Sequence, residues 1–242
     1  MGSGRNWATM SRRLLAALPH WRFVTVDLRG HGDSHGQDDS DTVAACAADL
    51  AALADHLGME PKALIAHSFG GKVALQYAAQ RPPSLENVWC LDSSPFRLSS
   101  EATALVDAVL RAAQMAPMPV AHRLAMVPYF ESQGFSRSVG AWMTTNLKRA
   151  DNGFVWRFDL ARIQKLLDDY RHLDCWAGLE SEGRTTTVNW VLASRSTWWQ
   201  NGMEPRLRAL NASRVNVLPN SGHWVHIDNP DGLLSLICEQ LT

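Results

Sequence analysis

The chain has 242 residues, of which 46% are hydrophobic and 19% charged, and its formal net charge is −1. That length and composition suit one large globular domain with an ample core. A nearly neutral chain has no general electrostatic attraction to nucleic acid or to an anionic membrane surface, so we expect neither as a partner. No uninterrupted apolar run is long enough to span a bilayer, and the first residues lack a signal-peptide pattern.

The four cysteines, Cys46, Cys90, Cys175 and Cys238, show no paired spacing. Reduced thiols in an intracellular protein are therefore expected. The choice between cytoplasm, mitochondrion and plastid stays open, because any targeting segment is not in this chain. No histidine, cysteine and carboxylate pattern has the spacing of metal ligands, so we expect no metal and no cofactor.

Helices and strands alternate along the first 96 residues. This rhythm predicts a mostly parallel, doubly wound α/β sheet with helices on both faces. Gly58 is expected to end the second helix, whose apolar residues recur with helical spacing. The expected helices cover about 7–18, 42–57 and 71–79, and the expected strands cover 22–28, 62–65 and 87–91.

Between the strand at 62–65 and the helix at 71–79 stands the sequence Ala66-His67-Ser68-Phe69-Gly70. A serine flanked by small residues at such a turn is typical of a nucleophile elbow, in which a strained backbone exposes the hydroxyl above the sheet. The residues two before and two after the serine must be small, because the strand and helix backbones nearly touch there. Gly70 and Gly71 meet that demand, and Ala66 is the residue two before the serine. Alanine in place of the usual glycine is a mild departure. His67 is expected to point elsewhere, because adjacent residues on a turn diverge.

The alternation breaks between about residues 96 and 183, where helical patterns follow one another without an intervening strand. Helices are expected at 136–146 and 160–172, with a turn and an extended stretch at 152–157. We expect residues 97–182 to form a helical cap insertion over the mouth of the active site. Residues 1–96 and 183–242 would then form the core.

The alternation of strands and helices resumes near the C-terminus, with strands at 187–192 and 214–218 and helices at about 203–210 and 231–241. A serine nucleophile needs a base to take its proton, and the base needs an acid to orient it. His223 lies in the loop after the last strand, where the base of such a fold belongs. His226, three residues later, would suit a metal reading, but no other ligand pattern supports it.

Two positions could carry the acid, and the residues favour one of them. The strand at 87–91 ends directly at Asp92, whereas no carboxylate follows the strand at 187–192. Asp92 is therefore the predicted acid, although an aspartate after a strand can also be a simple turn residue. Asp27 precedes the elbow and is expected to fix the loop 29–34. Asp228 follows His223 too closely to reach its far ring nitrogen.

The backbone N–H of Phe69 is the expected first oxyanion donor, since it follows the nucleophile. The second donor normally comes from a strand and a His-Gly turn that precede the elbow, and nothing before Trp7 matches them. We expect the first strands and this donor to be missing with the N-terminus. Such a chain should have an unpaired sheet edge and a weakened rate of ester turnover.

Together these motifs resemble the α/β-hydrolase superfamily, and more narrowly its small serine esterases. The resemblance covers essentially the whole chain, and family members begin earlier, which implies an N-terminally truncated sequence. It also implies that the acid follows the strand after the elbow helix, as Asp92 does, and that Ser196 supports the Asp92–His223 pair. Ser196 could equally be a plain turn serine. The resemblance rests on residues 2–7, 27–34, 67–72, 145–147, 154–157 and 222–226.

We therefore expect a cofactor-free serine hydrolase that cleaves carboxylic esters or thioesters through an acyl-enzyme. Ser68 would attack, His223 would move the proton and Asp92 would orient His223. An epoxide hydrolase or dehalogenase would need an aspartate at position 68, but a C–C hydrolase or lyase could use the same triad. The alternative of another class is a catalytically weak or inactive binding protein. Ala66 and the absent oxyanion strand keep it open, while the intact triad argues against it. Substrate identity and oligomeric state stay undetermined.

Overall fold

The computed structural model describes residues 1–35, 40–80, 82–196 and 203–241, and it divides into two compact units. The first unit comprises residues 1–11, 23–41 and 99–166, and the second comprises residues 12–22, 42–98 and 167–242. Two helices, α1 (Ala8–Ala17) and α7 (Leu160–His172), have residues in both units.

The second unit contains a four-stranded sheet in the order β1-β2-β5-β6, and all of its strands are parallel. The strands are β1 (Ala63–His67), β2 (Asn87–Leu91), β5 (Thr187–Ala193) and β6 (Ser213–Leu218). The two central strands are almost wholly buried. Their near-continuous apolar sequence is what a parallel sheet covered on both faces requires.

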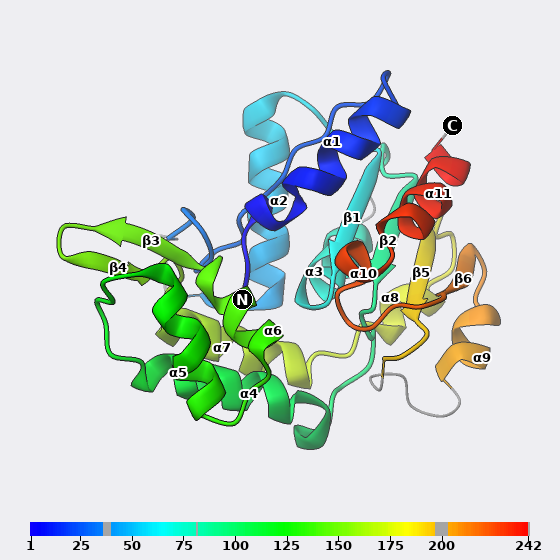
Figure 1. Cartoon of the computed structure of the whole chain (residues 1–242). Coiled ribbons are helices and arrows are strands. Elements are labelled where there is room, and N and C mark those ends of the chain that lie inside the picture. Colours follow the sequence, from blue (N-terminus) through cyan, green and yellow to red (C-terminus); the bar gives the residue numbers. More distant parts are fainter. Residues whose placement is uncertain (36–39, 81, 197–202, 242) are drawn as a thin grey trace. The chain divides into compact units, whose positions relative to one another are not determined.

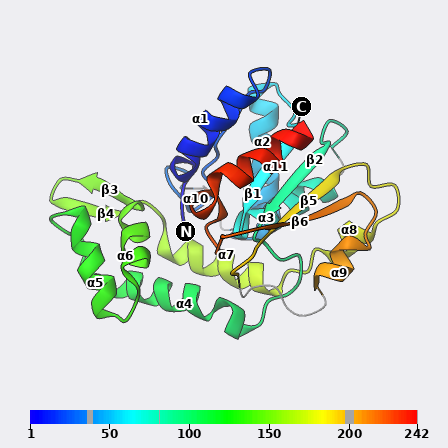
Figure 2. The same ribbon diagram turned by 45° about the vertical axis from the view of Figure 1, so that its right-hand side comes forward.

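Helices lie on both faces of this sheet. Helices α2 (Val43–Leu57) and α3 (Phe69–Ala79) lie on one face, and α11 (Pro230–Leu241) lies on the other (Figure 1). Figure 2 shows the same elements after a partial turn about the vertical axis. The predicted parallel sheet with helices on both faces is confirmed. Three short helices complete the unit: α8 (Trp176–Glu180), α9 (Met203–Arg208) and α10 (Val225–Asp228).

Both ends of α2 follow from the sequence. The Thr42 hydroxyl accepts a hydrogen bond from the backbone N–H of Ala45 at 3.1 Å, which is an ordinary N-cap. Gly58 ends the helix with a φ of 61°. A residue without a side chain adopts that left-handed conformation at little cost, so the predicted end is confirmed.

The first unit is mainly helical. Its helices are η1 (Gly4–Trp7), α4 (Ser100–Met115), η2 (Arg123–Ala125), α5 (Met126–Ser132) and α6 (Arg137–Thr144). It also contains an antiparallel hairpin of β3 (Leu147–Ala150) and β4 (Gly153–Trp156). The expected turn and extended stretch at 152–157 correspond to the hairpin turn and β4, whereas β3 was not predicted from the sequence. The φ of 135° at Gly153 supports a tight turn that only glycine adopts readily, and the short strands pair locally.

The predicted strand at 22–28 was also wrong, because these residues form no regular secondary structure. Alternating apolar residues favour a strand only where a neighbouring backbone supplies the ladder. The end of the segment is held differently: the Asp27 carboxylate accepts hydrogen bonds from the backbone N–H groups of Gly4 (2.6 Å) and Asp33 (2.9 Å). Asp27 therefore fixes the loop after it, as expected.

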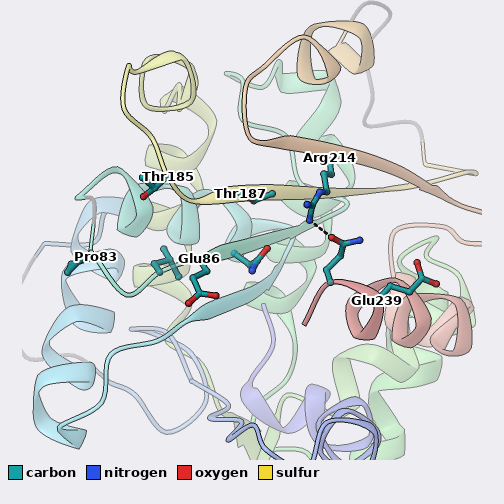
Figure 3. Close-up of a pocket in the computed structure, with 9 residues that line it drawn as sticks. Pro83, Glu86, Thr185, Thr187, Arg214 and Glu239 are labelled. Atoms are coloured by element: carbon teal, nitrogen blue, oxygen red, sulfur yellow. Dashed lines mark hydrogen bonds between the residues drawn. The ribbon is translucent and has the colours of Figure 1, made fainter. Parts of the chain in front are cut away.

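A polar pocket of about 410 Å³ lies at the amino ends of β2, β5 and β6 (Figure 3). Arg214 and Glu86 are among the side chains that line it, and Arg214 donates a hydrogen bond to Gln240. Open parallel sheets bind substrates at the carboxyl ends of their strands. The pocket is therefore at the wrong edge to be the active site.

In the described ranges, no helix is both long enough and apolar enough to cross a membrane.

Candidate active site

Ser68 occupies the turn that joins β1 to α3. Its φ of 53° and ψ of −119° are unusual for a residue with a side chain, and the backbone N–H donates to the carbonyl of Leu91 at 3.0 Å. Residues persist in such strained conformations only where the surrounding structure enforces them, and they cluster at functional sites. The serine thus has the backbone conformation expected at a nucleophile elbow.

The close packing at this turn falls on Gly71. A Cβ at Gly71 would lie 2.2 Å from the Ser93 hydroxyl oxygen, whereas a Cβ at Gly70 would meet the Ala66 Cβ at 3.7 Å, an ordinary contact. The methyl group of Ala66 is therefore accommodated, and Gly71 is the residue that lets α3 approach the end of β2. The sequence predicted the need for small residues at both Gly70 and Gly71, and the structure places the close approach at Gly71.

Asp92 directly follows β2, with a φ of 42°, and is fully buried. Its Oδ2 atom accepts two hydrogen bonds, one from Nδ1 of His223 at 2.7 Å and one from the Ser196 hydroxyl at 2.9 Å. The other oxygen accepts from the backbone N–H of Ala193 at 3.4 Å. The structure thus brings together three of the residues predicted from the sequence.

His223 lies in the loop between β6 and α10. Because the Asp92 carboxylate can only accept, the neutral His223 ring carries its proton on Nδ1 and leaves Nε2 as a proton acceptor. Asp228 accepts from the backbone N–H of Gly222 at 2.7 Å, so it holds the loop. It was excluded as the orienting acid from the sequence, and this contact gives it a different role.

Ser68 lies at the same edge of the sheet as Asp92. His67 pairs with Leu91 in the β1–β2 register, so Ser68 and Asp92 follow paired positions at the same edge of the sheet. In the described part of the chain, the Ser68 hydroxyl makes no hydrogen bond to the His223 ring. Such a bond is often long before substrate binds. The nucleophile–base contact therefore stays a prediction.

His67 was expected to point away from the site, and this expectation was wrong. Its Nε2 atom lies 2.5 Å from the backbone carbonyl oxygen of His223, and the two ring centroids are 4.6 Å apart. The ring of His226 packs edge-on against His67 at 5.4 Å. Burial and the two neighbouring rings lower the pKa of His67 well below 6.5. The sequence could have indicated this cluster, because His67 directly precedes the nucleophile and His226 follows the base by three residues.

Phe69 is the first residue of α3, and its ring lies 5.3 Å from that of Tyr170. Its backbone N–H belongs to the positive end of the helix, where an oxyanion is favoured. The expectation that the second oxyanion donor is missing stays a prediction. Among the described residues, no group of three or more histidine, cysteine, aspartate or glutamate side chains is arranged to hold a metal ion. All four cysteines are thiols.

Comparison with known proteins gives one family. A sequence model of the alpha/beta hydrolase family matches residues 2–236. The sn-1-specific diacylglycerol lipase ABHD11 of Mus musculus is 28% identical over 241 residues, which cover 98% of this chain and 76% of that protein. The esterase YbfF of Escherichia coli is 25% identical over 241 residues, covering 98% and 87% respectively.

Among solved structures, a marine microorganism esterase superposes with a TM-score of 0.85 at 19% identity. The match covers 98% of this chain and 90% of that one. At this level of identity the similarity establishes the fold alone.

Proposed function

The chain belongs to the alpha/beta hydrolase family and is a carboxylic ester hydrolase, and we propose that it cleaves carboxylic esters or thioesters through an acyl-enzyme formed on Ser68. The observation that carries this proposal is the pair of hydrogen bonds that Asp92 accepts from His223 and Ser196. Together with the strained elbow at Ser68, they supply a nucleophile, a base and an orienting acid at one edge of the sheet.

The proposed reaction proceeds in two halves. The Ser68 oxygen attacks the substrate carbonyl while Nε2 of His223 takes its proton, and the resulting imidazolium then protonates the leaving alcohol or thiol. Asp92 stabilises that imidazolium, because its buried carboxylate accepts from Nδ1. Water attacks the acyl-enzyme by the same route and regenerates Ser68.

The negative charge of each tetrahedral intermediate needs a donor. The backbone N–H of Phe69 serves this role in our proposal, because it immediately follows the nucleophile at the start of α3. One such donor contributes about 10²–10³ in rate in comparable enzymes.

Ser196 supports the acid in this proposal. Its hydroxyl donates to the same Oδ2 atom that accepts from His223. A fully buried carboxylate needs hydrogen-bond donors, and Ser196 and the N–H of Ala193 supply two beyond the histidine.

The substrate class is proposed from the relatives. One is named a diacylglycerol lipase and another an esterase, so an ester with an acyl chain is the natural candidate. We assign the choice of acyl chain to the proposed cap, residues 97–182. Initial rates on nitrophenyl esters of increasing acyl length would define the preference. A uniform rate over the whole series would contradict a selecting cap.

The acyl-enzyme can be tested by partitioning. If every substrate with one acyl group forms the same intermediate, added methanol should divide it between acid and methyl ester in a constant ratio. That ratio should hold for esters with different leaving groups. A ratio that depends on the leaving group would contradict a common acyl-enzyme. Loss of both products in Ser68→Ala would assign the intermediate to this residue.

The alternative, a weak or inactive binding protein, loses part of its basis. Ala66 was one reason to keep it open, and a Cβ at Gly70 would still be at an ordinary 3.7 Å from the Ala66 methyl group. The elbow is therefore not crowded by the alanine. Fluorophosphonate labelling separates the two functions, because only an activated serine reacts.

A further inference from the structure

His223 is held at two points, and only one of them belongs to the triad. Its ring donates from Nδ1 to Asp92 at 2.7 Å, and its backbone carbonyl oxygen lies 2.5 Å from Nε2 of His67. Asp92 follows β2 and His67 ends β1, so the two contacts come from neighbouring strands. A histidine whose main chain and ring are both bonded has little freedom to turn its second ring nitrogen.

The chemistry of the second contact fixes the protonation of His67. A carbonyl oxygen only accepts, so the Nε2 atom of His67 must carry the proton and donate it. The ring is neutral at ordinary pH, because burial and its histidine neighbours lower its pKa well below 6.5. The Nδ1 atom of His67 is therefore unprotonated. A neutral neighbour also avoids repelling the imidazolium that forms on His223.

The groups around His67 keep the ring in this position. His226 packs edge-on against it at a centroid distance of 5.4 Å, and burial lowers the pKa of His226 to about 4. His226 is thus a second neutral ring. The carboxylates on this side of the site, Asp92 and Asp228, contact His223 and Gly222 respectively. Asp228 thus holds the backbone N–H of Gly222, just before His223, and His67 holds the backbone carbonyl of His223 itself.

We propose that His67 is a positioning residue, which holds the backbone of His223 so that its ring keeps the orientation needed to take the proton of Ser68. The inference rests on the proposed function, because it assigns a role to His67 through the base of that reaction. It adds to the triad a residue that touches neither substrate nor reacting atoms.

Two substitutions at one position test the role. In His67→Gln, the side-chain amide offers an N–H near the place of Nε2, whereas His67→Met has similar volume and no donor. We expect His67→Met to lower kcat by about ten- to a hundredfold, the effect of a slightly misplaced catalytic group, with KM nearly unchanged. His67→Gln should recover most of kcat. Full kcat in His67→Met would overturn the proposal, as would equal losses in both variants at equal melting temperature.

Two further measurements keep the result interpretable. Nitrogen NMR of the histidine rings in the unsubstituted protein should show His67 protonated on Nε2 alone, with its signals identified by their loss in His67→Gln. A proton on Nδ1 instead would contradict the contact even if His67→Met fails to fold. Ser68→Ala separates the two proposals. If it is inactive while His67→Met is fully active, only the positioning role fails, and if it retains activity, the proposed function itself fails.

Discussion

The two halves of the candidate site are held in different ways. On the side of the base, side chains do the holding: Asp92 accepts from both His223 and Ser196. On the side of the nucleophile, the conformation and close packing of the backbone hold the site. Ser68 has a φ of 53°, and α3 approaches the end of β2 so closely that position 71 has no room for a methyl group.

This difference predicts how each half fails. A side-chain bond can be removed without moving the chain, so substitutions on the base side should lower the rate and leave the fold intact. The elbow depends on close packing of backbone, so a substitution there should lower stability together with activity. The predictions below test this contrast, from the largest expected effect to the smallest.

The largest effect on the base side should come from His223→Ala. Loss of the base in a comparable triad costs about 10⁶ in kcat, and we expect a loss of that order with little change in melting temperature. His56, an exposed histidine on α2, provides the control, and His56→Ala should keep full activity. Nitrophenyl ester hydrolysis and a thermal melt measure both quantities. Substantial turnover in His223→Ala would remove this residue from the mechanism.

Asp92→Asn should cost about 10⁴ in kcat, because an amide in place of the carboxylate favours the wrong histidine tautomer. The matched control is Asp228→Asn. Its amide oxygen can still accept from the N–H of Gly222, so activity should fall little. Full activity in Asp92→Asn together with a large loss in Asp228→Asn would show that the acid was wrongly assigned.

The elbow is tested by two adjacent glycines. Gly71→Ala places a Cβ 2.2 Å from the Ser93 hydroxyl, and such overpacking should lower the free energy of unfolding by about 1–3 kcal/mol and reduce activity with it. Gly70→Ala meets only the Ala66 methyl group at 3.7 Å and should be neutral or slightly stabilising in a helix. Denaturant unfolding measures both. Equal stability of the two variants would contradict the account of the turn.

The smallest effect should come from Ser196→Ala, which removes one of the donors to Asp92. We expect turnover to fall by about tenfold, the value of one hydrogen bond of ~1 kcal/mol or a little more. The melting temperature should barely change. An unchanged rate with unchanged stability would make Ser196 a turn residue.

Much of this could be predicted from the sequence, because the motifs that carry it are local. The elbow at Ser68 and the capped helix α2 each depend on a few neighbouring residues. Asp92, which contacts His223 in the structure, was predicted from a different local signal: a carboxylate follows one strand and none follows another. The alternation of strands and helices gave the parallel sheet, since it follows from burial on both faces.

What could not be predicted depends on contacts between distant residues. The segment 22–28 has the composition of a strand, but it pairs with no strand among the described residues. The close approach at Gly71 involves Ser93, on the loop after β2, and the sequence alone does not show which glycine faces it. His67 contacts the backbone carbonyl of His223, which lies 156 positions later in the chain. No local pattern specifies such a pairing.

The central claim is that Ser68 is an activated nucleophile. It is tested most directly by reacting the whole chain with a fluorophosphonate and identifying the modified residue by peptide mass spectrometry. We predict stoichiometric modification of Ser68, abolished in Ser68→Ala and strongly slowed in His223→Ala. An unmodified protein, or modification at another serine that persists in Ser68→Ala, would contradict the account.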